Sequence, residues 1–192
     1  PDDYFTMYHE LSYQHYKLQN MAGYYYFLND GTGTGNGGFN NFSFKTAFGR
    51  NSMDNPLYTR RGSSFTLSLQ LTPPYSLLNG VDYSKVGLSE RYKWIEYHKW
   101  TFTGKMFTPL TANDKSLVLM TRAMFSYLGH YNKNVKSPFE TFYMGGDGMS
   151  AYTSYGTDYI AMRGYESGSL TPYSSTTSSY AGYLYNKFTM EL

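Results

Sequence analysis

The chain has 192 residues, no cysteine, a formal net charge of +2 and only 16% charged residues, whereas 20% of its residues are aromatic. The lack of cysteine excludes a disulfide scaffold and a thiolate metal site, and the small net charge is uninformative about partners. No run of 18 apolar residues occurs, which excludes a membrane-spanning helix. The mean hydropathy of −0.53 still permits a membrane β-barrel, because only alternate strand residues of a barrel face lipid. Aromatic residues are enriched at both boundaries of such barrels.

Six segments alternate between apolar and polar residues. The clearest is Phe65–Thr72, in which one phenylalanine and three leucines alternate with threonine, serine and glutamine. This period of two predicts strands with one apolar and one polar face, and it excludes helices. His9, Glu96 and His98 fall on apolar faces and are exceptions. In chain order the predicted strands are Phe5–Leu18, Asn41–Gly49, Phe65–Thr72, Lys93–Phe107, Leu117–Tyr131 and Tyr183–Leu192.

Short and long connections alternate between these strands. Asn51–Gly62 and Thr108–Lys115 are short, whereas Gln19–Phe39, Pro73–Tyr92 and Asn132–Gly182 are longer. Outer-membrane barrels have this asymmetry, with short periplasmic turns and long external loops. Six strands are too few to close a barrel, since single-chain barrels begin at about eight. We therefore predict an all-β chain that forms the middle of a larger antiparallel transmembrane β-barrel.

The longest connection, residues 132–182, is the candidate functional segment. It contains the pair Gly145 and Gly146, followed by Arg163, Gly164 and Tyr165. Long, aromatic-rich loops usually carry function. If this loop folds into the barrel lumen, the Arg163 guanidinium needs a carboxylate partner there. Glu191 is the acid on the polar side of the following predicted strand.

Other motifs are weaker. Residues 31–38 contain one G-x-G-x-x-G match, but a strand pattern rather than a helix follows, so we expect a surface loop of unknown role. The four histidines lack metal-ligand spacing and no G-x-S-x-G elbow occurs, so we expect no metal, no cofactor and no enzymatic activity. Tyr24–Phe27 is suited to binding sugar or peptide, although a strand extension or an aromatic belt is the simpler interpretation.

Several segments resemble the BamA family, the barrel subunits of the outer-membrane protein assembly machinery. Ser137–Gly146, with Phe142 and Tyr143 at its turn, and the later Met162–Tyr165 resemble the family's sixth external loop. Phe188–Leu192 is similar to the strand after it. The regions around Asn51–Gly62 and Ser89–Trp100 resemble the Bacteroidetes branch of the family. Together the similar segments span nearly the whole chain.

The resemblance implies a barrel of about sixteen strands in the bacterial outer membrane, within the known size range, of which residues 1–192 would supply about the seventh to the twelfth. Residues 132–182 would fold into the lumen, where Arg163, Gly164 and Tyr165 would latch onto Glu191. The implied function is insertion of β-barrel proteins into this membrane. Implied partners are unfolded outer-membrane proteins as clients, accessory BAM lipoproteins, other outer-membrane subunits and lipids, but no nucleic acid. Periplasmic POTRA repeats and the barrel's first and last strands would lie outside this chain.

Three alternatives stay open at this point. A two-partner-type secretion pore would export a soluble protein through its lumen and carry a similar loop motif. A passive porin-like channel would lack both the inward loop and the POTRA repeats. A soluble all-β adhesion domain would not depend on detergent. The client range, the accessory subunits and the state of the barrel seam are not specified by the sequence.

Overall fold

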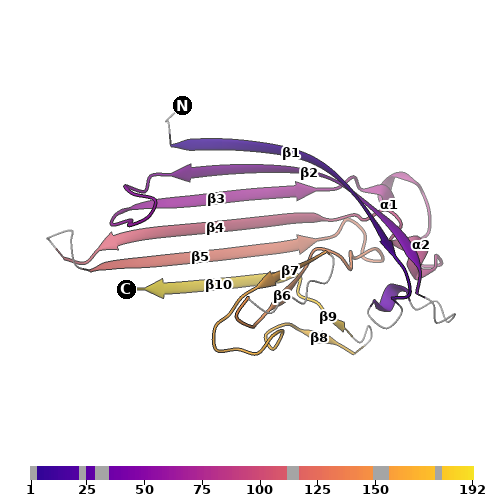
Figure 1. Ribbon diagram of the computed structural model, residues 1–192. Coiled ribbons are helices and arrows are strands. Elements are labelled where there is room, and N and C mark those ends of the chain that lie inside the picture. The colour runs from indigo at the N-terminus through magenta and orange to yellow at the C-terminus, as the bar shows by residue number, and fades with distance from the viewer. Residues whose placement is uncertain (1–3, 22–24, 29–34, 112–116, 149–155, 176–178) are drawn as a thin grey trace.

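The computed structural model describes residues 4–21, 25–28, 35–111, 117–148, 156–175 and 179–192. They form a six-stranded antiparallel sheet in the order β1-β2-β3-β4-β5-β10, shown in Figure 1. No helix within these ranges is long and apolar enough to cross a membrane. The sheet strands are β1 (Phe5–Leu18), β2 (Gly37–Asn51), β3 (Gly62–Leu71), β4 (His98–Pro109), β5 (Val118–Gly129) and β10 (Leu184–Glu191). The smaller elements are η1 (Tyr26–Leu28, a 3-10 helix), α1 (Tyr75–Leu78), α2 (Leu88–Arg91), β6 (Thr141–Met144), β7 (Thr157–Ile160), β8 (Tyr173–Ser174) and β9 (Ser179–Tyr180).

All six predicted strands are confirmed, but one begins later than its alternation indicates. The pattern predicts a strand from Lys93, whereas β4 begins at His98. The preceding residues leave the sheet because Glu96 is buried and its carboxylate accepts hydrogen bonds from the backbone N (2.8 Å) and Oγ (2.6 Å) of Ser76 in α1. Glu96 was therefore an exception on the predicted apolar face because it does not belong to the strand.

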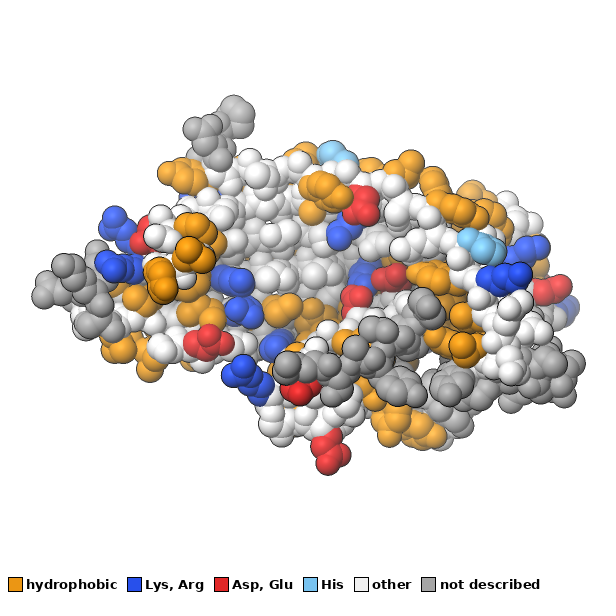
Figure 2. All heavy atoms as spheres, viewed as in Figure 1, with side chains coloured by type: hydrophobic (Ala, Val, Ile, Leu, Met, Phe, Trp, Pro, Cys, Tyr) orange, Lys and Arg blue, Asp and Glu red, His pale blue; other side chains and the backbone are white. Residues whose placement is uncertain are grey.

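The strand register separates the sheet into an apolar face and a polar face. Leu67 lies opposite Phe102, which in turn lies opposite Phe125, and apolar pairs such as Met7 with Phe48 and Leu184 with Tyr127 occur in the outer strands. The apolar face is uncovered: Met7 is 68% exposed and Phe188 is 77% exposed. On the polar face, short hydroxyl side chains bond across neighbouring strands. Figure 2 shows the middle of this face covered largely by white polar side chains and backbone. A concentration of exposed apolar side chains on one side is what a lipid-facing sheet requires.

The connections also follow the predicted asymmetry. In Figure 1 the turn between β2 and β3 lies at the same end of the sheet as the end of β4 and the start of β5, whereas α1 and α2 lie at the other end. The connection between β5 and β10, which carries β6 to β9, lies over part of the polar face (Figure 1). Contact with the sheet is direct, because the rings of Phe142 in β6 and Tyr185 in β10 are 4.9 Å apart. We call this segment, residues 130–183, the inner loop.

An aromatic core lies between the polar face and the long connections. Phe139 of the inner loop stacks on Tyr16 of β1 at 5.3 Å and contacts Phe27 at 5.2 Å. Phe27 is only 2% exposed, so its assignment to a strand extension or aromatic belt is wrong. It lies in η1 and is covered by the inner loop, and Tyr24 lies outside the described residues. The buried apolar side chains of the core are Leu18, Phe27, Leu28, Phe39, Tyr92, Ile95, Tyr97, Leu128, Val135, Phe139, Phe142 and Ile160.

The glycine-rich segment leads into a strand, as expected. Gly37 and Gly38 open β2, so no helix follows the G-x-G-x-x-G match and the dinucleotide-binding arrangement is not formed. Residues 31–34 lie outside the described residues.

Candidate functional site

The inner loop has a backbone frame of its own. β6 and β7 pair in parallel, with Phe142 opposite Asp158. β6 also exchanges two backbone hydrogen bonds with Gly182, of 2.9 and 3.0 Å, just before β10 begins. These bonds hold the loop against the strand that follows it. The loop is therefore an ordered layer on the polar face.

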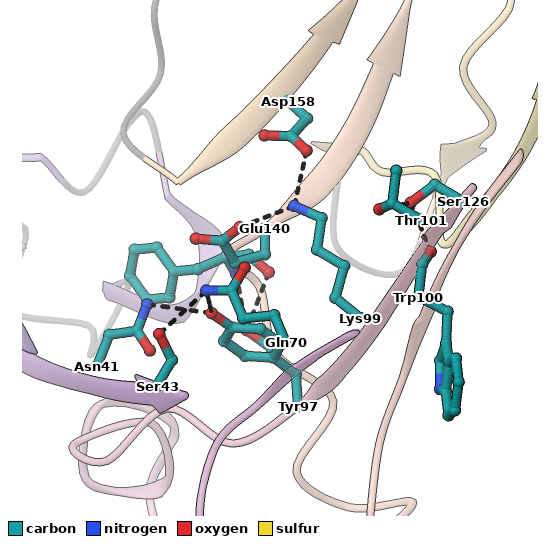
Figure 3. A network of polar contacts seen from close by, with 12 residues as sticks. Asn41, Ser43, Gln70, Tyr97, Lys99, Trp100, Thr101, Ser126, Glu140 and Asp158 are labelled. Atoms are coloured by element: carbon teal, nitrogen blue, oxygen red, sulfur yellow. Dashed lines mark hydrogen bonds and ion pairs between the residues drawn. The ribbon is translucent and has the colours of Figure 1, made fainter. Parts of the chain in front are cut away.

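Lys99, on the polar face of the sheet, attaches the inner loop to the sheet through ion pairs. Lys99 of β4 places its Nζ 2.8 Å from Glu140 Oε2 and 2.6 Å from Asp158 Oδ2, as Figure 3 shows. The side chains of Lys99 and Glu140 are only 9% and 16% exposed, whereas that of Asp158 is 51% exposed. Glu140 precedes β6 and Asp158 lies in β7, so one cation joins two parts of the loop to the wall. We call Lys99, Glu140 and Asp158 the Lys99 clamp.

The two carboxylates of the clamp compensate the buried positive charge of Lys99. A cation removed from water is stabilised only when carboxylates replace its hydration, and two of them do so here. The Lys99 Nζ also lies 5.4 Å from the ring centroid of Phe142, where the face of an aromatic ring attracts a cation. Lys187 of β10 adds a second tie, because its Nζ donates a hydrogen bond of 2.5 Å to the carbonyl oxygen of Ala161. The inner loop is thus attached to two different strands of the sheet.

A polar network supports the wall beside the clamp. The Tyr97 hydroxyl accepts a 2.7 Å hydrogen bond from Gln70 Nε2 and one of 3.4 Å from Asn41 Nδ2, and Gln70 Nε2 also donates to Ser43 Oγ at 3.0 Å (Figure 3). Tyr97 immediately precedes β4. Burial, together with the negative charge of Glu140, raises the pKa of its hydroxyl far above the ordinary value. The phenol therefore stays neutral and links β2 and β3 to the base of the clamp.

Replacing Tyr97 by Phe is expected to destabilise the folded barrel by about 1–2 kcal/mol, because the buried amides of Gln70 and Asn41 lose an acceptor while the ring volume is kept. The measurement is the urea midpoint of the purified full-length protein in detergent. Tyr58→Phe is the matched control, since Tyr58 is exposed in the connection between β2 and β3 and its midpoint should not change. Equal midpoints for both variants would contradict a structural role for the Tyr97 hydroxyl.

The structure brings the predicted Gly-Gly pair and the Arg-Gly-Tyr turn together. Gly146 N donates to Tyr165 O at 3.0 Å, and Met162 N donates to Gly146 O at 2.8 Å. Gly145 has a φ of +132°, and a Cβ there would lie 2.2 Å from the carbonyl oxygen of Glu166. Only glycine fits this crossing. The two motifs are therefore parts of one folded unit, held by backbone hydrogen bonds.

The aromatic residues of the predicted turn motif have different surroundings. Phe142 is buried against Tyr185, as described above. Tyr143 packs on Tyr159 and Tyr180, at ring-centroid distances of 5.2 and 6.3 Å. Both residues therefore belong to the packing of the inner loop, one toward the sheet and the other among the loop's own tyrosines.

The predicted pair of Arg163 and Glu191 is not joined. Both side chains are exposed, and neither forms an ion pair within the part of the chain that the structure describes. Lys187 contacts Ala161, and Glu191 lies four residues further along β10, about 13 Å at the rise of a strand. The register places Glu191 opposite Met120, diagonal to Arg122. Tyr165, the last residue of the motif, is 50% exposed.

In the observed ion pairs the positive and negative partners are exchanged relative to the predicted pair. We expected a loop arginine on a wall carboxylate, whereas a wall lysine holds two loop carboxylates. One signal in the sequence could have indicated it. Lys99 lies on the predicted polar face, and its strand neighbours there, Gln70 and Leu128, offer no negative charge. A lysine facing inward without an acidic neighbour in the sheet is therefore a candidate for pairing with a loop carboxylate.

Among the described residues, no group of three or more His, Asp or Glu side chains could hold a metal ion.

Comparisons with known proteins agree with this architecture. The search of curated proteins found no match. Among solved structures, the chain is similar to BamA from Haemophilus ducreyi lacking POTRA domains 1–3, with a TM-score of 0.65 and 18% identity. The similarity covers 98% of this chain, which spans about a third (34%) of that protein. The family model described as the Omp85 superfamily domain matches residues 2–192, and the chain therefore belongs to this superfamily of bacterial outer-membrane β-barrel proteins.

Proposed function

We propose that the chain is the central part of a BamA-type barrel that assembles and inserts β-barrel proteins into the outer membrane. The observation that carries this proposal is the inner loop, which folds onto the polar face and is tied to β4 by the Lys99 clamp. Membership in the Omp85 superfamily favours this function over that of a passive porin-like channel. Family membership and the fold shared with BamA support the same function. The similarity around Asn51–Gly62 and Ser89–Trp100 supports assignment to a Bacteroidetes-type member.

The proposed mechanism uses no covalent chemistry. An incoming strand gains backbone hydrogen bonds at an unpaired barrel edge, which serves as its template. Mismatch between barrel height and bilayer thickness disorders the nearby lipid. Clients are unfolded outer-membrane proteins, and accessory lipoproteins and other outer-membrane subunits are the proposed partners. The part described here acts as a brace, since a loop tied to several strands resists deformation of the barrel wall when an edge elsewhere opens.

We further propose that residues 132–182 lie in the lumen and that Arg163, Gly164 and Tyr165 contribute to the brace. The Gly145–Gly146 pair positions this turn through three backbone hydrogen bonds. The Arg163 guanidinium is exposed and able to reach a carboxylate, either Glu191 after a shift of the turn or an acid of another barrel strand. Its planar fork would form two parallel hydrogen bonds, which lysine cannot do.

Arg163→Ala is expected to slow insertion by about tenfold, the effect of losing one charge-assisted hydrogen bond in the brace. The measurement follows folding of a denatured outer-membrane barrel into liposomes that contain the full-length protein. Arg60→Ala, which removes an exposed arginine from the short turn between β2 and β3, is the control and should leave the rate unchanged.

Two outcomes would count against these proposals. If Arg163→Ala inserts clients at the normal rate, the turn has no bracing role, although insertion itself stands. If the unaltered protein fails to accelerate client folding and instead shows a large, fluctuating conductance, the barrel is a secretion pore.

A further inference from the structure

A cavity of about 530 Å³ lies where the long connections gather, and none of the three residues of the Lys99 clamp lines it. Residues of η1, α2, β6, β7, β8, β9 and the start of the inner loop line it. Small-molecule sites in proteins have volumes of roughly 300–1,000 Å³. The cavity is therefore of ligand size, and its lining comes from segments far apart in the sequence.

Positive charge without compensation is the first property of this cavity. Arg91, Lys133 and Lys136 line it, and the described lining residues include no Asp or Glu. None of the three cations forms an ion pair with any residue that the structure describes. A concave site with three positive charges and low-dielectric walls attracts anions.

Arg91 is held in place by neutral groups. Its Nη1 donates to the carbonyl oxygen of Asn134 at 3.3 Å, and its Nη2 donates to that of Val86 at 3.0 Å. Its Nε is buried and has no hydrogen-bond partner in the described part of the chain. Carbonyl oxygens orient a guanidinium without neutralising it, so its full charge remains available to a ligand.

Aromatic side chains are the second property of the cavity. Tyr25, Tyr92, Tyr180 and Tyr183 line it together with the cations. Tyrosine offers an apolar ring face and a polar hydroxyl, which suits a ligand that has both a carbon ring and hydroxyl groups. A phosphate ester carries a charge of about −1.5 to −2 at pH 7 and matches several cations better than a single carboxylate does.

We propose that this cavity binds a phosphorylated saccharide, with the phosphate at Arg91, Lys133 and Lys136 and the sugar against the tyrosines. The ligand is either a soluble sugar phosphate or the phosphorylated headgroup of a glycolipid. Neither the Lys99 clamp nor the Arg-Gly-Tyr turn lines the cavity, so substitutions of its lysines leave both of these unaltered.

The test is calorimetric titration of the detergent-purified full-length protein with glucose 6-phosphate, glucose and inorganic phosphate. Glucose 6-phosphate should bind, and both other compounds should bind at least about tenfold more weakly, because each lacks one of the two recognised parts. Lys133→Gln and Lys136→Gln should each weaken binding by about tenfold, the effect of losing one charge-assisted contact. Lys85→Gln is the control, because Lys85 is an exposed lysine outside the cavity whose nearest acid is Asp82 at 3.6 Å.

A second arm identifies the source of the ligand. Phosphatidylcholine vesicles with and without diphosphoryl lipid A are mixed with the protein in nanodiscs. Binding of the lipid A vesicles that is lost in Lys133→Gln supports a glycolipid headgroup, and binding of glucose 6-phosphate alone supports a soluble ligand. The proposal is overturned if neither probe binds, if Lys133→Gln and Lys136→Gln bind normally, or if inorganic phosphate binds as tightly as glucose 6-phosphate.

Discussion

Replacing Lys99 by methionine in the full-length protein is expected to lower the free energy of unfolding by about 3 kcal/mol. Methionine fills the space of the lysine stem but leaves the poorly exposed Glu140 carboxylate without a cation. Removing one partner of a buried ion pair costs about 3–5 kcal/mol. We expect the lower end of this range, because the Asp158 carboxylate is half exposed and is hydrated when the lysine is absent. The urea midpoint in detergent and the protease sensitivity of the inner loop are the measurements, and both should show a loosened loop.

Lys105→Met is the matched control for Lys99. Lys105 lies on the same strand and faces the same side, but it forms no ion pair with the residues that the structure describes. Its replacement should change the midpoint little. Adding Glu140→Gln to Lys99→Met should restore part of the lost stability, because it removes the uncompensated charge. If Lys99→Met and Lys105→Met unfold at the same urea concentration, the clamp does not hold the loop.

Replacing Gly145 by alanine is expected to disrupt the close contact between the two loop motifs. The free energy of unfolding should fall by about 3 kcal/mol or more. A φ of +132° is strained for any residue with a Cβ, and this Cβ would also meet the carbonyl oxygen of Glu166 at 2.2 Å. The obstacle is backbone, so relief requires the chain around Glu166 to move. Heat-dependent electrophoretic migration of the folded barrel is the measurement, with a lower transition temperature expected for the variant.

Gly164→Ala separates the two causes. Gly164 has a φ of +85°, but a Cβ there would find no atom within 4 Å. Its replacement adds backbone strain of about 1–2 kcal/mol without a clash. Gly145→Ala should therefore lower the transition temperature clearly more than Gly164→Ala does. A similar decrease for both would mean that backbone strain alone matters and that the tight crossing is not required.

Local patterning was sufficient to predict the sheet. In a strand, successive side chains point to opposite faces, so alternation such as that of Phe65–Thr72 fixes both the element and its two faces. Strands that are consecutive in the chain then pair as antiparallel neighbours, so the order of strands in the sheet follows the chain. The alternation of short and long connections indicated correctly which end of the sheet carries the long segments. The resemblance of the loop and strand segments is confirmed at the level of the superfamily, since the Omp85 model matches the chain.

Local patterning could not predict what covers the polar face. Lys99 and Glu140 are separated by 41 residues, and no local pattern shows that these two charges meet. Phe27 looks like part of an aromatic run and is buried because Phe39, Tyr92 and Phe139, all distant in sequence, pack on it. The predicted pair of Arg163 and Glu191 has suitable chemistry, but the turn places the guanidinium elsewhere.

The sequence by itself thus determined the strands, their two faces and their neighbours, because these depend on residues close together along the chain. Only the tertiary structure decided how the inner loop docks, which charges meet and which aromatic rings are buried. Such contacts depend on the path of a long connection, and no periodicity of the residues encodes that path.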